Sequence, residues 1–326
     1  MTIDCVSAEH GKNFSAYSGD CVEIMAQLPP NSIDFSVYSP PFANLYIYSE
    51  SVRDMGNVEN DQEFQAAYSH AVREKLRITK PGRLTSIHVK DLVYYSNASA
   101  KGDRGIRDFT GACIKTHVDA GWTLHSRVTV WRCPVREMTK SKPDGLLYKN
   151  FRKDAGRIRQ GMPEYIVTFR KWSDEMGETP PVIHVPGLVD EWGGEGKQFI
   201  GAGHDDDYYR ALDIWQQWAS PVWMKTDEKN VLNVKIARDE DAERHLCPMP
   251  LDLSERCVRL WSNKGDVVLS PFMGIGSEGW SALKADRKFI GTELNPTYFA
   301  QAAKMLREAE ATVGGGDLLQ FDRGAA

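Results

Sequence analysis

Short apolar runs alternate with helix-length segments along most of this chain, and this alternation limits the folds that it can adopt. The short runs are typical of buried strands, and the longer segments carry apolar residues at helical spacing. The expected strands span 33–38, 84–89, 123–131, 165–170, 266–270 and 288–294, and the expected helices span 61–78, 109–120 and 277–285. Strands separated by helices predict an α/β fold with a doubly wound, mostly parallel sheet. The Lys80-Pro81-Gly82 turn is expected to separate the first helix from the strand at 84–89.

The alternation stops between residues 172 and 244. Prolines and glycines accumulate there, together with four tryptophans, Trp192, Trp215, Trp218 and Trp223. A chain of 326 residues is long enough for one large domain and a smaller inserted one. We therefore expect 173–244 to be an inserted, loop-rich module between 1–172 and 245–326, with its tryptophans forming a small core of their own.

Charge and cysteine usage narrow the class of protein. The formal net charge is −5, so any contact with nucleic acid must come from local basic patches. The six cysteines are scattered without a C-x-x-C pair, which argues against a zinc site or a disulfide framework and fits a reducing cytoplasm. We expect no secretory signal, because the segment Met1–Val6 lacks a basic region followed by an apolar run. We expect no membrane span, because no apolar stretch approaches the roughly 20 residues that a bilayer requires.

A glycine-containing loop follows the strand at 266–270. The segment Ser270-Pro271-Phe272-Met273-Gly274-Ile275-Gly276-Ser277 runs from that strand into the expected helix. Glycine permits positive φ and lets backbone N–H groups approach a ligand, and a helix N-terminus favours negative charge. Such a loop suits a nucleotide-like or carboxylate-bearing ligand, although a purely structural turn explains two glycines equally well.

An acidic residue closes the next strand, in Gly291-Thr292-Glu293-Leu294-Asn295. A carboxylate there, about 20 residues beyond the glycine loop, is placed to accept hydrogen bonds from ribose hydroxyls. A nicotinamide oxidoreductase would share both features. The loop lacks the G-x-G-x-x-G spacing, however, and its Pro271-Phe272 opening better suits a cofactor with one adenosine and an amino-acid tail.

A rigid turn, Ser39-Pro40-Pro41-Phe42, follows the strand at 33–38. Two prolines fix φ and remove two backbone donors, at the strand end where open α/β sheets place their chemistry. Ser39 and a backbone carbonyl can accept hydrogen bonds from an exocyclic amino group, and Phe42 can stack on an extruded base. On these residues alone, a solvent-facing structural turn is at least as good an explanation.

The two elements together resemble those of the DNA amino-methyltransferases, which modify N6 of adenine or N4 of cytosine. The family's catalytic motif is Asp, Asn or Ser followed by Pro-Pro and an aromatic residue, and its cofactor motif has the form Phe-x-Gly-x-Gly. The order found here, with the catalytic motif first, resembles the β-class, a circular permutation of the Rossmann-like methyltransferase fold. The resemblance covers most of the chain and implies S-adenosylmethionine as the cofactor.

Other segments resemble the family in the same order along the chain. They are Ser18–Val22, Lys80–Leu84, Gly121–Trp131, Pro163–Val167 and Arg244–Pro250. The resemblance assigns catalysis to Ser39, Pro40, Pro41 and Phe42. It assigns cofactor binding to Asp20, Cys21, Ser39, His245, Pro248, Ser270, Phe272, Gly274, Gly276, Ser277, Glu293 and Leu294. Two departures are Ser270, where the family usually has Asp, and Cys247, which interrupts the usual His-Pro pair.

The resemblance implies direct methyl transfer from the sulfonium to the amino nitrogen. Hydrogen bonds from the amino group to Ser39 and to the Pro40 carbonyl would make that nitrogen more nucleophilic, so positioning and electrostatics supply the catalysis. The reaction needs no metal, and we expect no metal site. The sequence does not identify a general base.

A basic segment is the candidate for contact with the DNA backbone. Residues 140–159 carry a net charge of +5, from Lys140, Lys142, Lys149, Arg152, Lys153, Arg157 and Arg159 against two aspartates. Such a cluster suits phosphate contact, and a solvated basic loop is the alternative. Lys101, Arg104 and Arg107 form a possible second contact. The family places target recognition in the region that matches the inserted module.

Several alternatives stay open. Ser39 favours N4 of cytosine, but the residue before it is Tyr38 where the N4 pattern usually has Thr, so the base is unresolved. The same fold also methylates RNA or protein amides, and a catalytically silent module that binds S-adenosylmethionine or DNA is a further alternative. Relatives of the β-class are often dimers, so we expect a homodimer or a higher homo-oligomer acting on double-stranded DNA.

Overall fold

The computed structural model describes residues 3–41, 55, 61–96, 101–140, 148–157, 159–172, 179–183, 214–224, 226–232 and 248–313. A nine-stranded sheet runs through this part of the chain in the order β1-β2-β11-β10-β3-β4-β8-β7-β9. Its strands are β1 (Ser7–His10), β2 (Phe14–Ser18), β3 (Ile33–Tyr38), β4 (Thr79–Val89), β7 (Thr123–Val130), β8 (Glu164–Arg170), β9 (Val222–Trp223), β10 (Val267–Ser270) and β11 (Lys288–Glu293). A separate hairpin pairs β5 (Leu92–Tyr94) with β6 (Gly105–Arg107).

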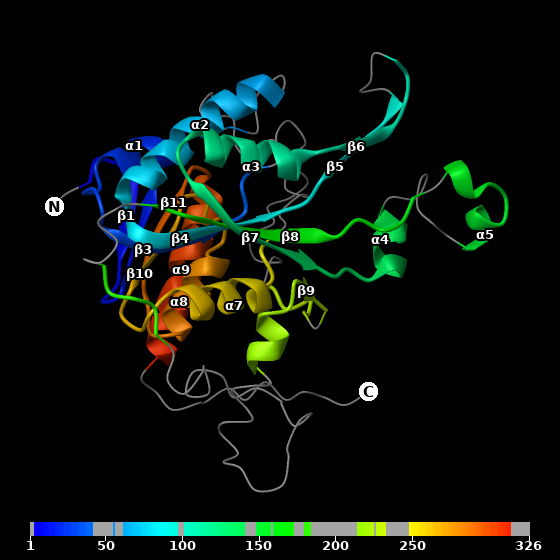
Figure 1. Cartoon of the computed structure of the whole chain (residues 1–326). Helices are drawn as coiled ribbons and strands as arrows, with labels where there is room; N and C mark the ends of the chain where they lie inside the picture. The colour runs from blue at the N-terminus through cyan, green and yellow to red at the C-terminus, as the bar shows by residue number, and fades with distance from the viewer. Residues whose placement is uncertain are drawn as a thin grey trace, which may run out of the picture.

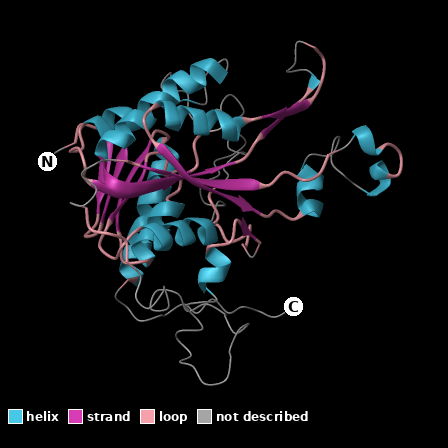
Figure 2. Ribbon diagram, viewed as in Figure 1, coloured by secondary structure: helices cyan, strands magenta, loops and turns pink. Residues whose placement is uncertain are grey.

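Helices cover both faces of the sheet (Figures 1 and 2). One face carries α1 (Cys21–Ala26), α2 (Asp61–Ile78) and α3 (Phe109–Asp119), and the other carries α7 (Leu251–Trp261), α8 (Ser277–Lys284) and α9 (Pro296–Thr312). Beyond one end of the sheet lie α4 (Pro134–Lys140), α5 (Tyr148–Phe151) and the short η3 (Ala155–Arg157). The five neighbouring strands from β2 to β4 pair in parallel, which confirms the doubly wound, mostly parallel α/β fold.

The predicted elements agree with the structure except where long-range pairing extends a strand. The strand at 33–38 and the helix at 61–78 have the predicted bounds. The strand expected from residue 84 begins at Thr79 instead, because Thr79 pairs with Ile33 before the register shifts. Gly82 lies in this irregular part of β4 with φ +77° and donates to the Lys171 carbonyl at 2.8 Å.

Part of the region expected as an inserted module joins the main sheet. Strand β9 pairs in parallel with the end of β7, and Trp223 is buried in the cluster formed by α7, α8 and α9. Arg256 of α7 lies over the rings of Trp218 and Trp223, with its guanidinium carbon 5.4 and 4.8 Å from their centroids. The expectation that these tryptophans form a separate core is therefore wrong for Trp223.

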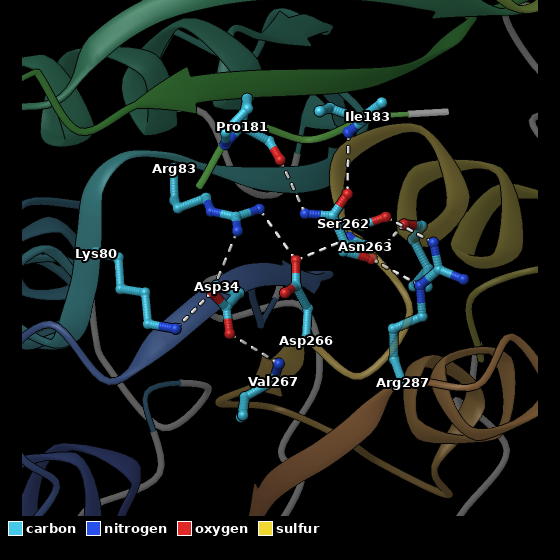
Figure 3. Close-up of polar contacts among 11 residues, drawn as sticks. Asp34, Lys80, Arg83, Pro181, Ile183, Ser262, Asn263, Asp266, Val267 and Arg287 are labelled. Atoms are coloured by element: carbon cyan, nitrogen blue, oxygen red, sulfur yellow. Dashed lines mark hydrogen bonds and ion pairs between the residues drawn. The ribbon is translucent and has the colours of Figure 1, made fainter. Parts of the chain in front are cut away.

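A buried charge network joins strands from the two ends of the chain (Figure 3). Asp34 of β3 accepts a hydrogen bond from the Val267 N–H at 3.0 Å and pairs with Lys80 at 2.7 Å. Arg83 of β4 lies between Asp34 and Asp266, at 3.5 and 3.0 Å. Since Asp34 is the second residue of β3 and Val267 is the first of β10, this network fixes the register of the two central strands.

The opposite edge of the sheet gathers the ends of the parallel strands. This is where four strands end, namely β3, β4, β10 and β11. Strand β8 runs antiparallel to β4 and starts at the same edge, where its Ile166 pairs with His88 near the end of β4. In open α/β sheets this edge holds the ligand site.

No helix in the described ranges is long and apolar enough to cross a membrane.

Candidate functional site

The Ser39 turn lies directly beyond buried β3. Tyr38 ends the strand with a side chain that is 1% exposed, Pro40 is buried, and Ser39 and Pro41 are half-buried. The two prolines cannot donate to a neighbouring strand, so the chain leaves the sheet at this point. Phe42 lies outside the described residues. The turn therefore presents the Ser39 hydroxyl at the carboxyl edge of the sheet, as predicted.

Ser39 contacts a histidine that the sequence motifs did not single out. The Oγ of Ser39 lies 3.2 Å from Nδ1 of His88 on β4, and Nε2 of His88 lies 2.7 Å from Oε2 of Glu164 on β8. Both side chains are largely buried, His88 being 13% and Glu164 16% exposed. A serine, an imidazole and a carboxylate thus form a connected series across three neighbouring strand ends.

Cations surround the carboxylate of Glu164. Arg132, which is 4% exposed, forms a close ion pair with Oε2, and Lys90 lies 4.0 Å from Oε1. Burial raises the pKa of Glu164, but the hydrogen bonds and charges of His88 and Arg132 outweigh it and hold the pKa well below its usual range. Glu164 is therefore ionised at neutral pH, so it can only accept hydrogen bonds.

The glycine loop has the backbone conformation that its sequence predicts. Gly274 and Gly276 have φ of +51° and +93°, and Gly276 is the N-cap of α8. The left-handed region favours glycine, and a Cβ on Gly276 would also lie 3.4 Å from Ala302. The loop therefore turns sharply and leaves the first N–H groups of α8 without helical acceptors, at the edge where β10 ends.

Glu293 fixes the position of this loop. Its Oε2 accepts from the Gly274 N–H at 2.9 Å, and its Oε1 accepts from the Asn295 N–H at 2.8 Å. Each carboxylate oxygen has a second lone pair, so ribose hydroxyls remain possible donors. The expected ribose contact thus stays a prediction, and the structure adds a second role, in which Glu293 joins the end of β11 to the glycine loop.

Two buried hydroxyls at the loop support a ligand there. Ser270 is fully buried and Ser277 is 2% exposed, and neither Oγ has a hydrogen-bond partner among the described residues. A buried polar atom without a partner is costly, so such atoms often mark the place of a missing ligand. Together with the positive φ of Gly274 and Gly276, these hydroxyls fit a polar cofactor.

Asp20 and Cys21, two residues predicted to bind the cofactor, lie at the neighbouring strand end. The Oδ1 of Asp20 caps α1 by accepting from the N–H groups of Val22 and Glu23, at 2.8 and 3.1 Å. The Gly19 N–H donates to the Glu293 carbonyl at 3.0 Å, which keeps this turn beside the end of β11. Cys21 is buried, and burial raises the pKa of its thiol. Asp20, Cys21 and Glu293 are therefore close enough to line one site.

The end of β3 before the Ser39 turn meets the glycine loop through aromatic residues. Strands β3 and β10 are paired neighbours, with Leu269 opposite Ser36. The ring of Phe272 lies 5.6 Å from that of Tyr38, the residue before Ser39. The structure therefore brings together the two elements that the sequence predicted from its opposite ends.

Some predicted residues cannot be placed. His245 and Lys142 lie outside the described residues, as do the side chains of Lys140, Lys149 and Arg157. Pro248 lies before α7 and Leu294 after β11, both half-buried. The described part of the chain contains no group of three or more His, Cys, Asp or Glu residues that could hold a metal ion.

The basic segment at 140–159 lies within the connection from β7 to β8, the strand whose start carries Glu164. This connection projects past the sheet, with α4 and α5 beyond the ends of β7 and β8 (Figure 1). Arg152 and Lys153 are exposed, as are Tyr148 and Phe151, at 76% and 53%. Exposed cations and aromatic rings on this projection suit contact with a nucleic acid.

Comparison with known proteins agrees with this geometry. The family model for N6/N4 methylases, described as DNA methylase, matches residues 33–304. M.BglI, a Type II methyltransferase of Bacillus subtilis, is 22% identical over 322 residues, covering 90% of this chain and 85% of that protein.

Two solved structures share the fold. The protein TTHA0409 of Thermus thermophilus, in a complex with S-adenosyl-L-methionine, has a TM-score of 0.59 and 19% identity, over 91% of this chain and 96% of its own. The cytosine-N4-specific PvuII DNA methyltransferase has a TM-score of 0.52 and 17% identity, over 95% of this chain and 96% of its own. At these identities the likeness extends to the fold alone.

Proposed function

The chain belongs to the N6/N4 DNA methylase family, and on that premise we propose that the Ser39 turn is the reaction centre of a sequence-specific DNA methyltransferase. The enzyme depends on S-adenosylmethionine and methylates an exocyclic amine of DNA, N6 of adenine or N4 of cytosine. In this proposal the target base is lifted out of the duplex, because its amino nitrogen is otherwise out of reach of the Ser39 turn.

The adjacency of two loops carries this proposal. The Ser39 turn follows β3, the glycine loop follows β10, and these strands are direct neighbours joined by the contact of Tyr38 with Phe272. A methyl donor in the glycine loop and an amino group at Ser39 would therefore lie side by side at one edge of the sheet. The order of the two loops along the chain supports the proposed circular permutation of the methyltransferase fold.

Each part of the site has a role in direct transfer. When bound, S-adenosylmethionine supplies an electrophilic methyl group. Ser39 Oγ and the Pro40 carbonyl accept hydrogen bonds from the amino group, which leaves the nitrogen lone pair free to attack, and Phe42 stacks on the base. The cofactor contacts come from Asp20, Cys21, His245, Pro248, Ser270, Phe272, Gly274, Gly276, Ser277, Glu293 and Leu294.

The remaining assignments concern DNA and assembly. The basic segment at 140–159 contacts phosphates beside the site, and residues 173–244 recognise the target sequence between the catalytic part, 1–172, and the cofactor-binding part, 245–326. The exposed Arg152 and Lys153 support the phosphate contact. The proposal also includes a homodimer or higher homo-oligomer and a cytoplasmic location; light scattering of the purified protein tests the assembly.

One experiment tests the activity, the base and the site together. Genomic DNA from cells without other methyltransferases, transformed to express this chain, is sequenced by a single-molecule method, and its nucleosides are identified by mass spectrometry. The proposal expects N6-methyladenine or N4-methylcytosine at one recurring sequence. Unmodified DNA from cells that contain the folded protein would contradict it, and methylated RNA or protein would favour the other substrate classes.

A further inference from the structure

The negative charge of Glu164 sets the direction of hydrogen-bond donation along the Ser39–His88–Glu164 series. We infer that His88 and Glu164 form with Ser39 a proton relay, which receives the proton released by the target amino group during methyl transfer. The inference rests on the proposed function, because it takes Ser39 to contact the amine. In this relay Ser39 is the catalytic residue, and His88 and Glu164 act through it as positioning residues.

The ionised Glu164 decides which nitrogen of His88 carries the proton. A carboxylate only accepts, so Nε2 of His88 donates to Oε2 across their 2.7 Å contact. In the neutral ring the other nitrogen, Nδ1, is then an acceptor. While the ring is neutral, the Ser39 hydroxyl donates to Nδ1 at 3.2 Å, which leaves the lone pairs of Oγ as acceptors toward the site. A hydroxyl held in this way accepts from an amino group and cannot donate to it.

The relay also accounts for the proton that the reaction must release. The lone pair of the amino nitrogen forms a bond to the methyl carbon, while the electrons of the carbon–sulfur bond remain on sulfur. The nitrogen then carries a positive charge and two protons. One proton passes to Ser39 Oγ as the hydroxyl proton moves to Nδ1 of His88, giving a methylated amine and an imidazolium paired with Glu164. The imidazolium later returns this proton to water.

The charges around His88 make this step dependent on pH. Glu164 faces it from β8, and Arg132 and Lys90 approach that same carboxylate. Beyond them, Glu137 of α4 pairs with Lys90 at 2.6 Å, and Glu228 lies 3.3 Å from Arg136 and 4.0 Å from Arg132. Protonated His88 donates from both nitrogens, so it would reverse the hydrogen bond of Ser39. The relay therefore predicts a lower rate of transfer at acid pH.

The chain offers a matched control for a histidine variant. Nδ1 of exposed His10 lies 3.0 Å from Ser15 Oγ, on strands β1 and β2. It resembles the His88 contact but lies away from the Ser39 turn. Its replacement should leave both the rate and the pH profile of methyl transfer unchanged.

The kinetic test measures single-turnover transfer of tritiated methyl groups to unmethylated genomic DNA across a pH series. The wild type should lose activity at acid pH through one ionisation. His88→Gln should be about 10²-fold slower, which is the usual contribution of a general acid–base group. It should also lack that ionisation. Glu164→Gln should move the ionisation to lower pH, because it removes the anion that stabilises the imidazolium. His88→Gln with the wild-type rate and profile would overturn the inference, provided that His10→Gln behaves as wild type.

A second measurement needs neither turnover nor a variant. Nitrogen-15 NMR of histidine-labelled wild type should assign the proton of neutral His88 to Nε2, and a proton on Nδ1 would overturn the relay.

A third measurement compares cofactor binding. Calorimetry should find the same affinity for S-adenosylmethionine in His88→Gln as in the wild type. If the wild type transfers no methyl group to DNA, the proposed function fails, and the NMR result still decides the direction of the hydrogen bonds.

Discussion

Tyr38 and Phe272 lie with ring centroids 5.6 Å apart, one residue before the catalytic turn and two residues after the end of β10. Tyr38 is 1% exposed, and its hydroxyl contacts that of Tyr68 at 2.9 Å, so the contact belongs to a packed core. A shift of the glycine loop would therefore move Tyr38 and, with it, the adjacent Ser39. This coupling supports the proposal that one rigid group aligns the cofactor with the target base.

Ser39→Ala should slow methyl transfer by about 10²- to 10³-fold, because it removes an acceptor aimed at the reacting amine. The affinity for S-adenosylmethionine should stay close to that of the wild type, since the glycine loop is untouched. Single-turnover kinetics and calorimetry measure the two quantities. An unchanged rate would remove Ser39 from its assigned role.

Glu293→Gln should weaken cofactor binding by about tenfold or more, because one of its oxygens becomes an NH₂ group facing a backbone N–H of Gly274 or Asn295. Calorimetry with S-adenosylmethionine measures the loss. Glu310→Gln is the matched control, since Glu310 accepts from the N–H groups of Lys12 and Asn13 at 3.0 and 2.6 Å, away from the glycine loop. Equal affinities in both variants would contradict the assigned role of Glu293.

Lys75→Met should make the protein more stable at neutral pH. Lys75 is fully buried between Tyr38 and His117, and this burial lowers its pKa well below 10.5. The unfolded chain holds the extra proton up to about pH 10.5, so folding at neutral pH must release it.

The stability of the wild type should consequently rise with pH by as much as about 1.4 kcal/mol per unit between about pH 8 and pH 10, relative to the variant. Urea unfolding at several pH values measures this slope. Lys115→Met replaces a lysine that is 75% exposed and should show no such difference. A constant gap between Lys75→Met and the wild type would contradict the prediction.

Arg83→Met should destabilise the fold by about 3 kcal/mol, because it removes the cation shared by buried Asp34 and half-buried Asp266 and leaves Asp34 with Lys80 alone. Arg307→Met offers the contrast. It breaks an ion pair with Glu9 in which Arg307 is 55% exposed, and such pairs contribute about 1 kcal/mol or less. Denaturant unfolding of both variants checks the ranking, and similar losses would argue against a structural role for the network.

Replacing Arg152 and Lys153 together by Ala should weaken DNA binding regardless of sequence. The slope of log affinity against log salt should fall by about two, one for each lost phosphate contact. Fluorescence anisotropy with a duplex oligonucleotide at several salt concentrations measures this slope. Lys304→Ala, an exposed lysine of α9, should leave the slope unchanged. The assignment would be wrong if the double variant kept the wild-type slope.

Local sequence patterns predicted those features that depend on neighbours in the chain. The helix at 61–78 and the strand at 33–38 follow from apolar spacing, and the turns at Ser39 and Gly274 follow from proline and glycine chemistry. The two-residue strand β9 is too short to show a period, and Trp223 joins the main core through pairing that no local pattern encodes.

The same limit applies to the site. His88 and Glu164 are separated by the whole of α3 and β7, and only the antiparallel register of β4 with β8 brings them together. One sequence signal was available, since both lie at ends of predicted strands near polar turns. It identifies no partner, because a histidine or glutamate at a strand end is common, whereas the 3.2 Å contact of His88 with Ser39 requires the assembled sheet.

The network around Arg83 also has a consequence for how the chain is made. Strand β3 pairs with β4 on one side and with β10 on the other, and Asp34 receives its hydrogen bond from Val267. During synthesis β3 and β4 leave the ribosome long before β10 does. One edge of β3 therefore stays without a pairing strand during that time. A chain that stops before Asp266 keeps that edge open to other strands, which makes premature termination a direct route to aggregation.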